Sequence, residues 1–115
     1  MNFSESLKKN KDFQKVYDNK KSYANKYLVM YVMPNQLNKN RIGISVSKKV
    51  GNSIVRHRVT RLIRESYRLQ ETKCAQGFDI ITIARPSSKD LAYKEIDSAL
   101  THVLKLHGLY GEYDK

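Results

Sequence analysis

The sequence predicts an α+β fold, a single-domain sandwich in which helices pack on a small mixed sheet. Two observations predict this class. Short segments alternate apolar and other residues as strands do, and longer segments place apolar residues about every three or four positions as helices do. These two kinds of segment are interleaved along a chain of 115 residues, which is enough for one ordinary core and too short for two. We therefore expect one domain spanning residues 1–115.

The first half of the chain predicts one helix and two strands. Lys9–Asp18 places apolar side chains at helical spacing, and Asn19–Lys21 ends this helix. Tyr27–Met33 is rich in β-branched and aromatic residues, so we expect a strand there. Pro34–Asn40 indicates a turn or loop, after which Arg41–Ser47 alternates an apolar face with a small, polar face.

The central part of the chain predicts a long helix followed by a strand. Gly51 supplies a turn, and either Asn52 or Ser53 is expected to cap the helix. The helix should continue to about Gln70. Phe78–Ala84 is almost continuously apolar, as expected for a strand that is covered on both faces or lies centrally in the sheet.

A third helix is expected near the C-terminus. Ser87 with Asp90 forms a candidate capping box at its start. Its core stripe comprises Leu91, Ile96, Ala99, Leu100, Val103 and Leu104. Gly108 is the expected stop, and Leu109–Lys115 is expected to fray.

The helices are expected to cover one face of the sheet and to leave the other face for a ligand. That other face would carry aromatic platforms beside small residues, namely Tyr27, Tyr31, Gly43 and Ser45. Such a surface suits unpaired nucleotides, because bases stack on aromatic rings and small residues let a backbone come close. For Phe13 and Tyr17 the alternative is a packing role, in which the two rings simply hold the first helix against the sheet.

The helix over residues 53–70 has one apolar side and one strongly basic side. At about 100° per residue, its core stripe comprises Val55, Val59, Leu62, Ser66 and Leu69, with Ile63 at the margin. The opposite side carries His57, Arg61, Arg64 and Arg68, with Arg56 and Arg58 on the flanks. Only Glu65 is available to screen these cations, whereas an ordinary solvated helix mixes the two signs. Because the guanidinium fork suits phosphate, this side predicts polyanion binding; the alternative is a merely soluble cationic helix.

The overall composition indicates the same kind of partner. Lys and Arg number 22 against 11 Asp and Glu, which gives a net charge of +11 and a pI near 9.8. Cys74 is the only cysteine and cannot form an internal disulfide, so a reducing cytoplasm is expected. The sequence has no secretory h-region and no run approaching about 18 apolar residues, so we expect no membrane partner.

The sequence offers few groups for hydrolysis. His57, His102 and His107 have no paired carboxylate or nucleophile in their sequence context, and Cys74 has no activating motif. The stretch Gly43–Lys49 lacks the glycine spacing of a P-loop. Four acids of the second half form no convincing cluster for metal-assisted cleavage: Asp79, Asp90, Glu95 and Asp97. The chain is therefore not expected to cut RNA alone, and the missing groups disfavour a self-sufficient nuclease. A structural RNA-binding module, such as a ribosomal protein, is the main alternative.

Nearly the whole chain resembles the protein subunit of bacterial ribonuclease P. The resemblance is carried by the segments LKKNKDFQKVY, SYANKYLVMYV, RIGISVSKKVGNSIVRHRVTRLIRESYR and FDIITIARPSSKD, and by the final helix. It implies a compact α+β fold that is similar to a ribosomal-protein domain and has a left-handed crossover. It also implies that the protein assists removal of the leader from precursor tRNA, whereas the large RNA subunit performs the hydrolysis. The Mg²⁺ ions would be bound mainly by that RNA, with none intrinsic to the protein.

The same resemblance implies two binding surfaces. The first would contact the catalytic RNA through Arg56, His57, Arg58, Arg61 and Arg64, on the basic side that also carries Arg68. The second, a cleft between the first helix and the sheet, would bind the leader through Phe13, Tyr17 and Tyr31, with Lys48, Lys49 and Arg85 along its rim. The family usually carries asparagine at the position of His57 and a basic residue at that of Thr60. The expected partners are therefore ribonuclease P RNA and precursor tRNA.

Overall fold

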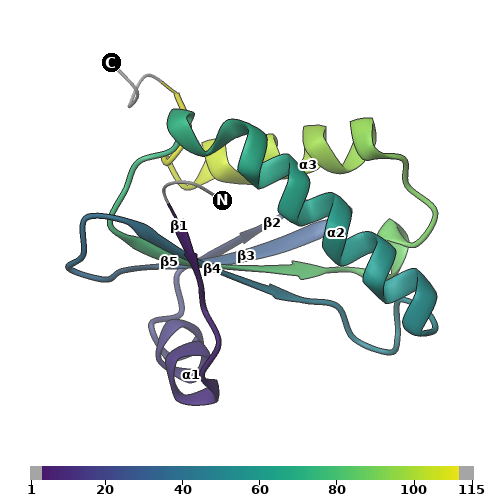
Figure 1. Cartoon of the computed structure of the whole chain (residues 1–115), viewed down its shortest axis with the longest axis horizontal. Coiled ribbons are helices and arrows are strands. Elements are labelled where there is room, and N and C mark those ends of the chain that lie inside the picture. Colours follow the sequence, from purple (N-terminus) through teal and green to yellow (C-terminus); the bar gives the residue numbers. More distant parts are fainter. Residues whose placement is uncertain (1–3, 112–115) are drawn as a thin grey trace.

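The structure is a computed structural model that describes residues 4–111, in which a five-stranded sheet separates two layers of helices (Figure 1). The sheet order is β1-β4-β5-β3-β2. The strands are β1 Ser4–Ser6, β2 Ser22–Ala24, β3 Leu28–Pro34, β4 Asn40–Ser45 and β5 Phe78–Ala84. The helices are α1 Asn10–Asp18, α2 Ser53–Gln70 and α3 Tyr93–Leu106, with short 3-10 turns η1 Glu71–Lys73 and η2 Pro86–Ser88. The prediction of an α+β fold is confirmed.

The sheet is mixed, and its parallel part contains an unusual connection. β4 pairs in parallel with both β1 and β5, whereas β3 pairs antiparallel with β5 and with β2. In Figure 1, β4 lies in front of β5, both run from left to right, and α2 returns above them from right to left. The unit β4-α2-β5 is therefore a left-handed crossover, although nearly all such crossovers are right-handed.

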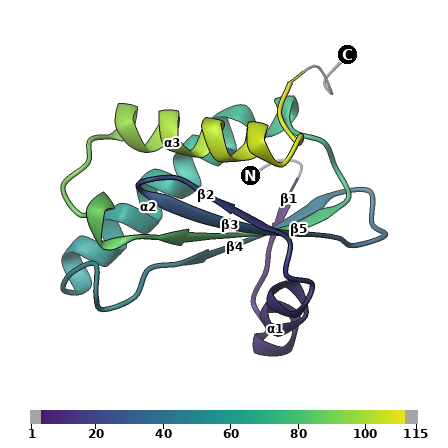
Figure 2. The same cartoon turned by 180° about the vertical axis from the view of Figure 1, so that it is seen from behind.

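The helical layers are unequal. α2 and α3 lie on one face of the sheet, and α1 lies alone on the other (Figures 1 and 2). The expectation that the helices cover only one face is thus wrong for α1. The reason is a second apolar cluster, in which Val16 of α1 is buried with Leu7 and Ile81.

Residue alternation along the strands supplies both apolar clusters. Leu28, Met30 and Val32 of β3 are buried in the large cluster beneath α2 and α3. Tyr31 and Met33 point the other way and pack against the α1 cluster. Tyr31 therefore lies on the face away from α2 and α3, as expected. Tyr27 differs, because it precedes the strand and packs against the large cluster instead of forming a platform on the α1 face.

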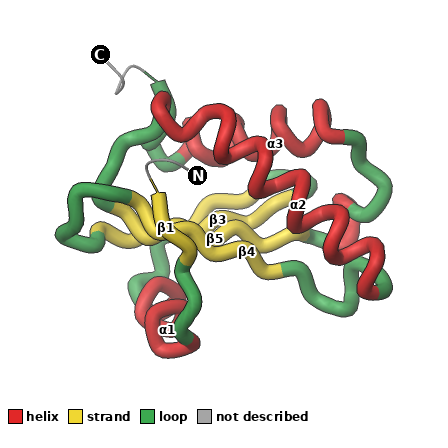
Figure 3. Tube along the Cα trace, viewed as in Figure 1, coloured by secondary structure: helices red, strands yellow, loops and turns green. Residues whose placement is uncertain are grey.

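The two edge strands were not predicted from the sequence. β1 and β2 are only three residues long and mostly exposed, and neither contains the alternating apolar residues that indicate a strand. Figure 3 shows β1 as a short strand near the N-terminus. Their pairing comes from neighbouring strands: Ser4–Ser6 aligns with the start of β4, and Ser22–Ala24 aligns with the middle of β3.

The buried side of α2 is rotated from the predicted stripe. The buried residues are Val59, Ile63, Ser66, Tyr67 and Gln70, whereas Leu69 is 59% exposed. Two of the buried residues are polar, Ser66 from the predicted stripe and Gln70, which the rotation adds, and side chains of α3 satisfy both. The Ser66 hydroxyl donates to Oδ1 of Asp97 at 2.7 Å, and Oε1 of Gln70 accepts from the Thr101 hydroxyl at 3.0 Å. Asn52 is the helix cap, since its Oδ1 accepts from the Val55 amide at 3.0 Å.

The C-terminal region also differs from prediction. The proposed capping box at Ser87 and Asp90 is wrong, because α3 begins after Ala92, whose amide donates to Oε1 of Glu95 at 3.0 Å. Leu109 is buried and Tyr110 forms a β-bridge with Cys74, so residues 109–111 do not fray. Residues 112–115, on which the rest of that prediction falls, lie outside the described part of the chain.

The three histidines have different surroundings. His57 and His102 are exposed. His107 is only 8% exposed at the end of α3, where its Nε2 donates to the Met30 carbonyl at 2.9 Å. Burial lowers the pKa of His107, so its imidazole is neutral at pH 7. Across residues 4–111, no helix has both the length and the apolar character needed to cross a membrane.

Candidate nucleic-acid interfaces

The basic face of α2 comprises the six residues Arg56, His57, Arg58, Arg61, Arg64 and Arg68. All six lie on the one helix, and four of them are exposed: His57, Arg61, Arg64 and Arg68. Arg56 and Arg58 are half-buried at the flanks. The structure therefore places every predicted residue on one continuous helical surface.

The six side chains are not equally available to a ligand. Arg58 donates from Nη2 to the Leu91 carbonyl at 2.6 Å, which fixes it against the start of α3. Arg68 forms a two-point ion pair with Glu65, at 2.6 and 2.9 Å, which lowers the pKa of Glu65. Within residues 4–111, no acidic side chain pairs with Arg61 or Arg64. These two arginines are accordingly the most available cations of the face.

A second candidate surface lies on the opposite face of the sheet, beside α1. There Phe13 and Tyr17 of α1 approach Tyr31 of β3: the Tyr17 and Tyr31 rings meet edge to face at 5.0 Å, and the Phe13 and Tyr17 rings lie 6.4 Å apart. A groove beside them is lined by Leu7, Lys8, Asn10, Phe13, Gln14, Tyr17, Ile44 and Ser45. Tyr31 is not part of this lining but adjoins the groove through its contact with Tyr17, and we call the groove together with the three rings the aromatic cleft. Burial raises the pKa of Tyr17, so its phenol stays neutral and can stack or donate a hydrogen bond.

The register of the sheet explains why α1 packs where it does. Tyr31 pairs with Ile81, and Ile81 pairs with Gly43, so these three residues form a row across the middle of the sheet. Gly43 leaves a gap in this row that the Phe13 ring fills, since a Cβ atom there would lie 2.6 Å from Cζ of Phe13. The expectation that Gly43 admits a nucleic-acid backbone is therefore wrong, because an aromatic side chain of the protein already occupies that space.

The predicted rim residues follow the ends of two neighbouring strands, and none of them is part of the groove lining. Lys48 and Lys49 follow β4, and Arg85 follows β5. The two strands are parallel, with Ser45 opposite Ile83, so the segments that follow them leave the sheet at the same end. All three cations are exposed. Arg85 is oriented by a hydrogen bond from Nη1 to the Asn25 carbonyl at 2.9 Å.

Hydrolytic groups do not converge in the described structure. Within residues 4–111, no three His, Cys, Asp or Glu side chains come close enough together to hold a metal ion. Cys74 is 2% exposed, and burial raises the pKa of its thiol to about 12, so it is not an activated nucleophile. What the structure offers is charge and aromatic surface for binding.

Comparisons with known proteins agree with this arrangement. A family model described as Ribonuclease P matches residues 1–107. The chain belongs to the ribonuclease P protein family. The ribonuclease P protein component of Lachnoclostridium phytofermentans is 62% identical over 104 residues, which are 90% of each chain. That of Alkaliphilus oremlandii is 56% identical over 99 residues, which are 86% of this chain and 87% of the relative.

Solved ribonuclease P proteins share the fold. The Staphylococcus aureus RNase P protein superposes with a TM-score of 0.86 at 39% identity, over 92% of this chain and 97% of that one. The RNase P protein from Thermotoga maritima gives a TM-score of 0.82 at 28% identity, over 89% and 96% of the two chains. As a ribonuclease P protein component, the chain is a subunit of an endoribonuclease that processes the 5′ ends of precursor tRNA. Membership of the family implies association with ribonuclease P RNA.

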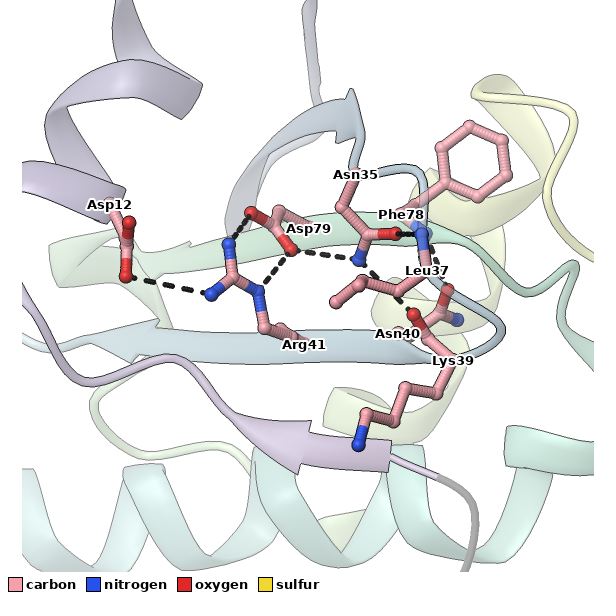
Figure 4. Close-up of polar contacts among 8 residues, drawn as sticks. All are labelled: Asp12, Asn35, Leu37, Lys39, Asn40, Arg41, Phe78 and Asp79. Atoms are coloured by element: carbon pink, nitrogen blue, oxygen red, sulfur yellow. Dashed lines mark hydrogen bonds and ion pairs between the residues drawn. The ribbon is translucent and has the colours of Figure 1, made fainter.

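One polar cluster of this ribonuclease P protein was not predicted (Figure 4). Asp79 of β5 is fully buried and accepts two hydrogen bonds from Arg41 of β4, at 2.8 and 2.6 Å. Asn35 donates to the same carboxylate at 2.9 Å, and Asp12 of α1 lies 3.5 Å from Nη1 of Arg41. The signal was present in the sequence, because an acid inside an apolar strand needs a cationic partner. The sequence did not show which of the many cations supplies it.

Replacing Gly43 with alanine should disturb the aromatic cleft selectively. The added Cβ would collide with the Phe13 ring, so we expect a loss of about 1–3 kcal/mol in the free energy of unfolding and a displaced α1. Urea denaturation measures the stability, and NMR contacts between Tyr17 and Tyr31 report the position of α1. Ser45→Ala, on the same face of β4, is the matched control and should have little effect. Unchanged stability and unchanged ring contacts in Gly43→Ala would contradict this account.

Proposed function

We propose that the chain acts as one RNA-binding domain that holds two RNAs at once. The basic face of α2 binds the catalytic RNA of ribonuclease P, and the aromatic cleft binds the single-stranded 5′ leader of precursor tRNA. One observation carries this proposal: the two surfaces lie on opposite faces of the sheet, because α2 covers one face and α1 stands on the other. Neither ligand would therefore block the other.

The basic face suits a folded RNA that carries many phosphates. Each cation that neutralises a phosphate releases counterions, so affinity gained in this way is large and sensitive to salt. Arg61 and Arg64 are the strongest candidates, since they are exposed and have no acidic partner within residues 4–111. The exposed pair of Arg68 with Glu65 is weak enough in water for Arg68 to exchange its partner for a phosphate.

The aromatic cleft suits an unpaired strand. Bases stack on aromatic rings whatever their identity, and the rim cations can follow the backbone. Half-buried Tyr31 and Tyr17 are held at fixed orientations by their edge-to-face contact, so little ordering is needed on binding. Mature tRNA has no leader to place in the cleft. Binding there would accordingly distinguish precursor from product.

The hydrolytic step belongs to the RNA in this proposal. The Mg²⁺ ions, held mainly by the RNA subunit, would supply the activated water and stabilise the developing negative charge. The contribution of this chain is positive charge at the RNA surface, which reduces repulsion between phosphates and so favours the folded, metal-loaded RNA at lower Mg²⁺ concentration.

Cleavage of a precursor tRNA at low Mg²⁺ tests the proposed function directly. Three reactions are compared: the protein alone, a bacterial ribonuclease P RNA alone, and both together. We expect strong cleavage only with both components. Cleavage by the protein alone would indicate a nuclease, and a protein that fails to stimulate the RNA would support the structural RNA-binding alternative.

Removing cations from the basic face should weaken assembly of the holoenzyme. For Arg61→Ala and Arg64→Ala, we expect weaker binding to ribonuclease P RNA, and in each variant the slope of log affinity against log salt should fall by about 1. Filter binding over a series of KCl concentrations gives both quantities. Lys94→Ala removes one exposed cation from α3 and is the matched control. An equal effect in Lys94→Ala would show that only net charge matters.

Removing the Tyr31 ring should affect the precursor selectively. Loss of a stacking platform is expected to cost about 1–3 kcal/mol in the binding of precursor tRNA to the holoenzyme. Binding of mature tRNA should be unchanged in Tyr31→Ala, and Tyr31→Phe, which keeps the ring, should resemble the wild type. An equal loss for precursor and mature tRNA would argue against a leader site in the cleft.

A further inference from the structure

The aromatic cleft depends on the placement of a very short helix. α1 has nine residues, and an isolated helix of this length is unstable in water. It also stands alone on its face of the sheet, whereas α2 and α3 pack against each other on the opposite face. The contacts between α1 and the sheet therefore decide whether Phe13 and Tyr17 are in place before any RNA arrives.

Apolar contacts hold one side of α1. Val16 is completely buried against the sheet, the Phe13 ring covers Gly43, and the Tyr17 ring meets Tyr31. These contacts surround the middle row of the sheet. Apolar contacts have little directional preference, so they resist removal of the helix more strongly than a small rotation or slide.

Polar contacts restrain α1 against such movement at both ends: Asn19 at its C-terminal end donates to the Val32 carbonyl at 3.3 Å, and Asp12 acts in its first turn. Asp12 lies next to Phe13 in the sequence, and its Oδ2 lies 3.5 Å from Nη1 of Arg41. Both side chains are largely shielded, with exposed fractions of 16% for Asp12 and 26% for Arg41. The pair is thus less accessible to water and salt than an ordinary surface ion pair.

The direction of this contact is fixed from the sheet side. Arg41 uses Nε and Nη2 for its two hydrogen bonds to Asp79, which is fully buried and is also bound by Asn35. Because a guanidinium group is planar and rigid, holding two nitrogens fixes the position of the third. Nη1 consequently points at Asp12 from a set place in the sheet (Figure 4).

We propose that Asp12 is a positioning residue for the leader site: through Arg41 it holds α1 in the one placement that keeps the aromatic cleft ready for an unpaired strand. This inference rests on the proposed function of the cleft. Asp12 need not touch RNA. It acts on the leader through the orientation of Phe13 and Tyr17.

The charge of Asp12 makes the inference testable, because a purely electrostatic role and a positioning role predict opposite changes in RNA affinity. A carboxylate beside an RNA-binding groove repels phosphate, so removing its charge should strengthen RNA binding if charge were its only influence. Positioning predicts the opposite result. A weaker complex after removal of a negative charge therefore cannot be explained by net charge.

The test compares Asp12→Asn with Asp18→Asn in the holoenzyme. Asp18 is an exposed acid at the end of the same helix, whose side chain accepts from Gln14, so this control changes the net charge equally without touching Arg41. We expect Asp12→Asn to bind precursor tRNA about two- to fivefold more weakly, in line with the loss of one partly exposed ion pair. Mature tRNA affinity and the single-turnover rate at saturation should not change. Asp18→Asn should bind the precursor as well as, or slightly better than, the wild type.

NMR contacts between the Tyr17 and Tyr31 rings, together with urea denaturation, complete the test. We expect Asp12→Asn to stay folded and to lose part of the ring contact, and Asp12→Glu, which keeps the charge, to recover much of the affinity. Unchanged or tighter precursor binding by Asp12→Asn would overturn the positioning role and leave the cleft assignment intact. Global unfolding of Asp12→Asn would also overturn it, by making Asp12 a general stability residue. A wild-type holoenzyme that binds precursor and mature tRNA equally would instead refute the proposed function.

Discussion

The buried ion pair between Arg41 and Asp79 is the constraint on which much of this structure depends. A carboxylate with no exposure to water is tolerated only with a cation and further donors, and here β4 supplies Arg41 while the turn after β3 supplies Asn35. Breaking such a pair from one side costs about 3–5 kcal/mol, because the remaining charge stays buried. The pair fixes the register of two parallel strands and gives α1, through Asp12, a point of attachment on the sheet.

The second organising feature is a sheet that is used on both faces. β3 and β5 send alternate side chains into a large cluster under α2 and α3 and into a small cluster under α1. The large cluster provides most of the buried apolar surface and holds α2 rigidly, so that its solvent side can carry concentrated positive charge. The small cluster carries a short helix and an open groove. Most of the buried apolar residues therefore belong to the large cluster, and each face presents one of the two proposed RNA-binding surfaces.

Sequence reasoning succeeded where the pattern was long and local. β4 and the three helices have clear apolar periodicity, β3 is rich in β-branched and aromatic residues, and β5 is an almost continuous apolar run. The basic face follows from helical geometry alone. Sequence reasoning failed where tertiary contacts determine which residues pair or become buried. β1 and β2 are too short to have a pattern, and Leu69 is exposed because α2 turns toward α3 with Tyr67 and Gln70 inward. The partner of Asp79, the ring that fills the space above Gly43, and the handedness of the crossover all depend on residues distant in sequence. The handedness and the cleft came from family resemblance.

The wide sequence separation of the residues around α1 has a consequence for biosynthesis. The basic helix is continuous in sequence, so it can form as soon as residues 53–70 leave the ribosome. The docking surface for α1 is different. It requires Gly43 from β4 and both Ile81 and Asp79 from β5, and β5 is synthesised after α2. Contacts that close long loops form slowly and late. We therefore expect a nascent chain to display an arginine-rich segment to cellular RNA before its first helix has a place to dock.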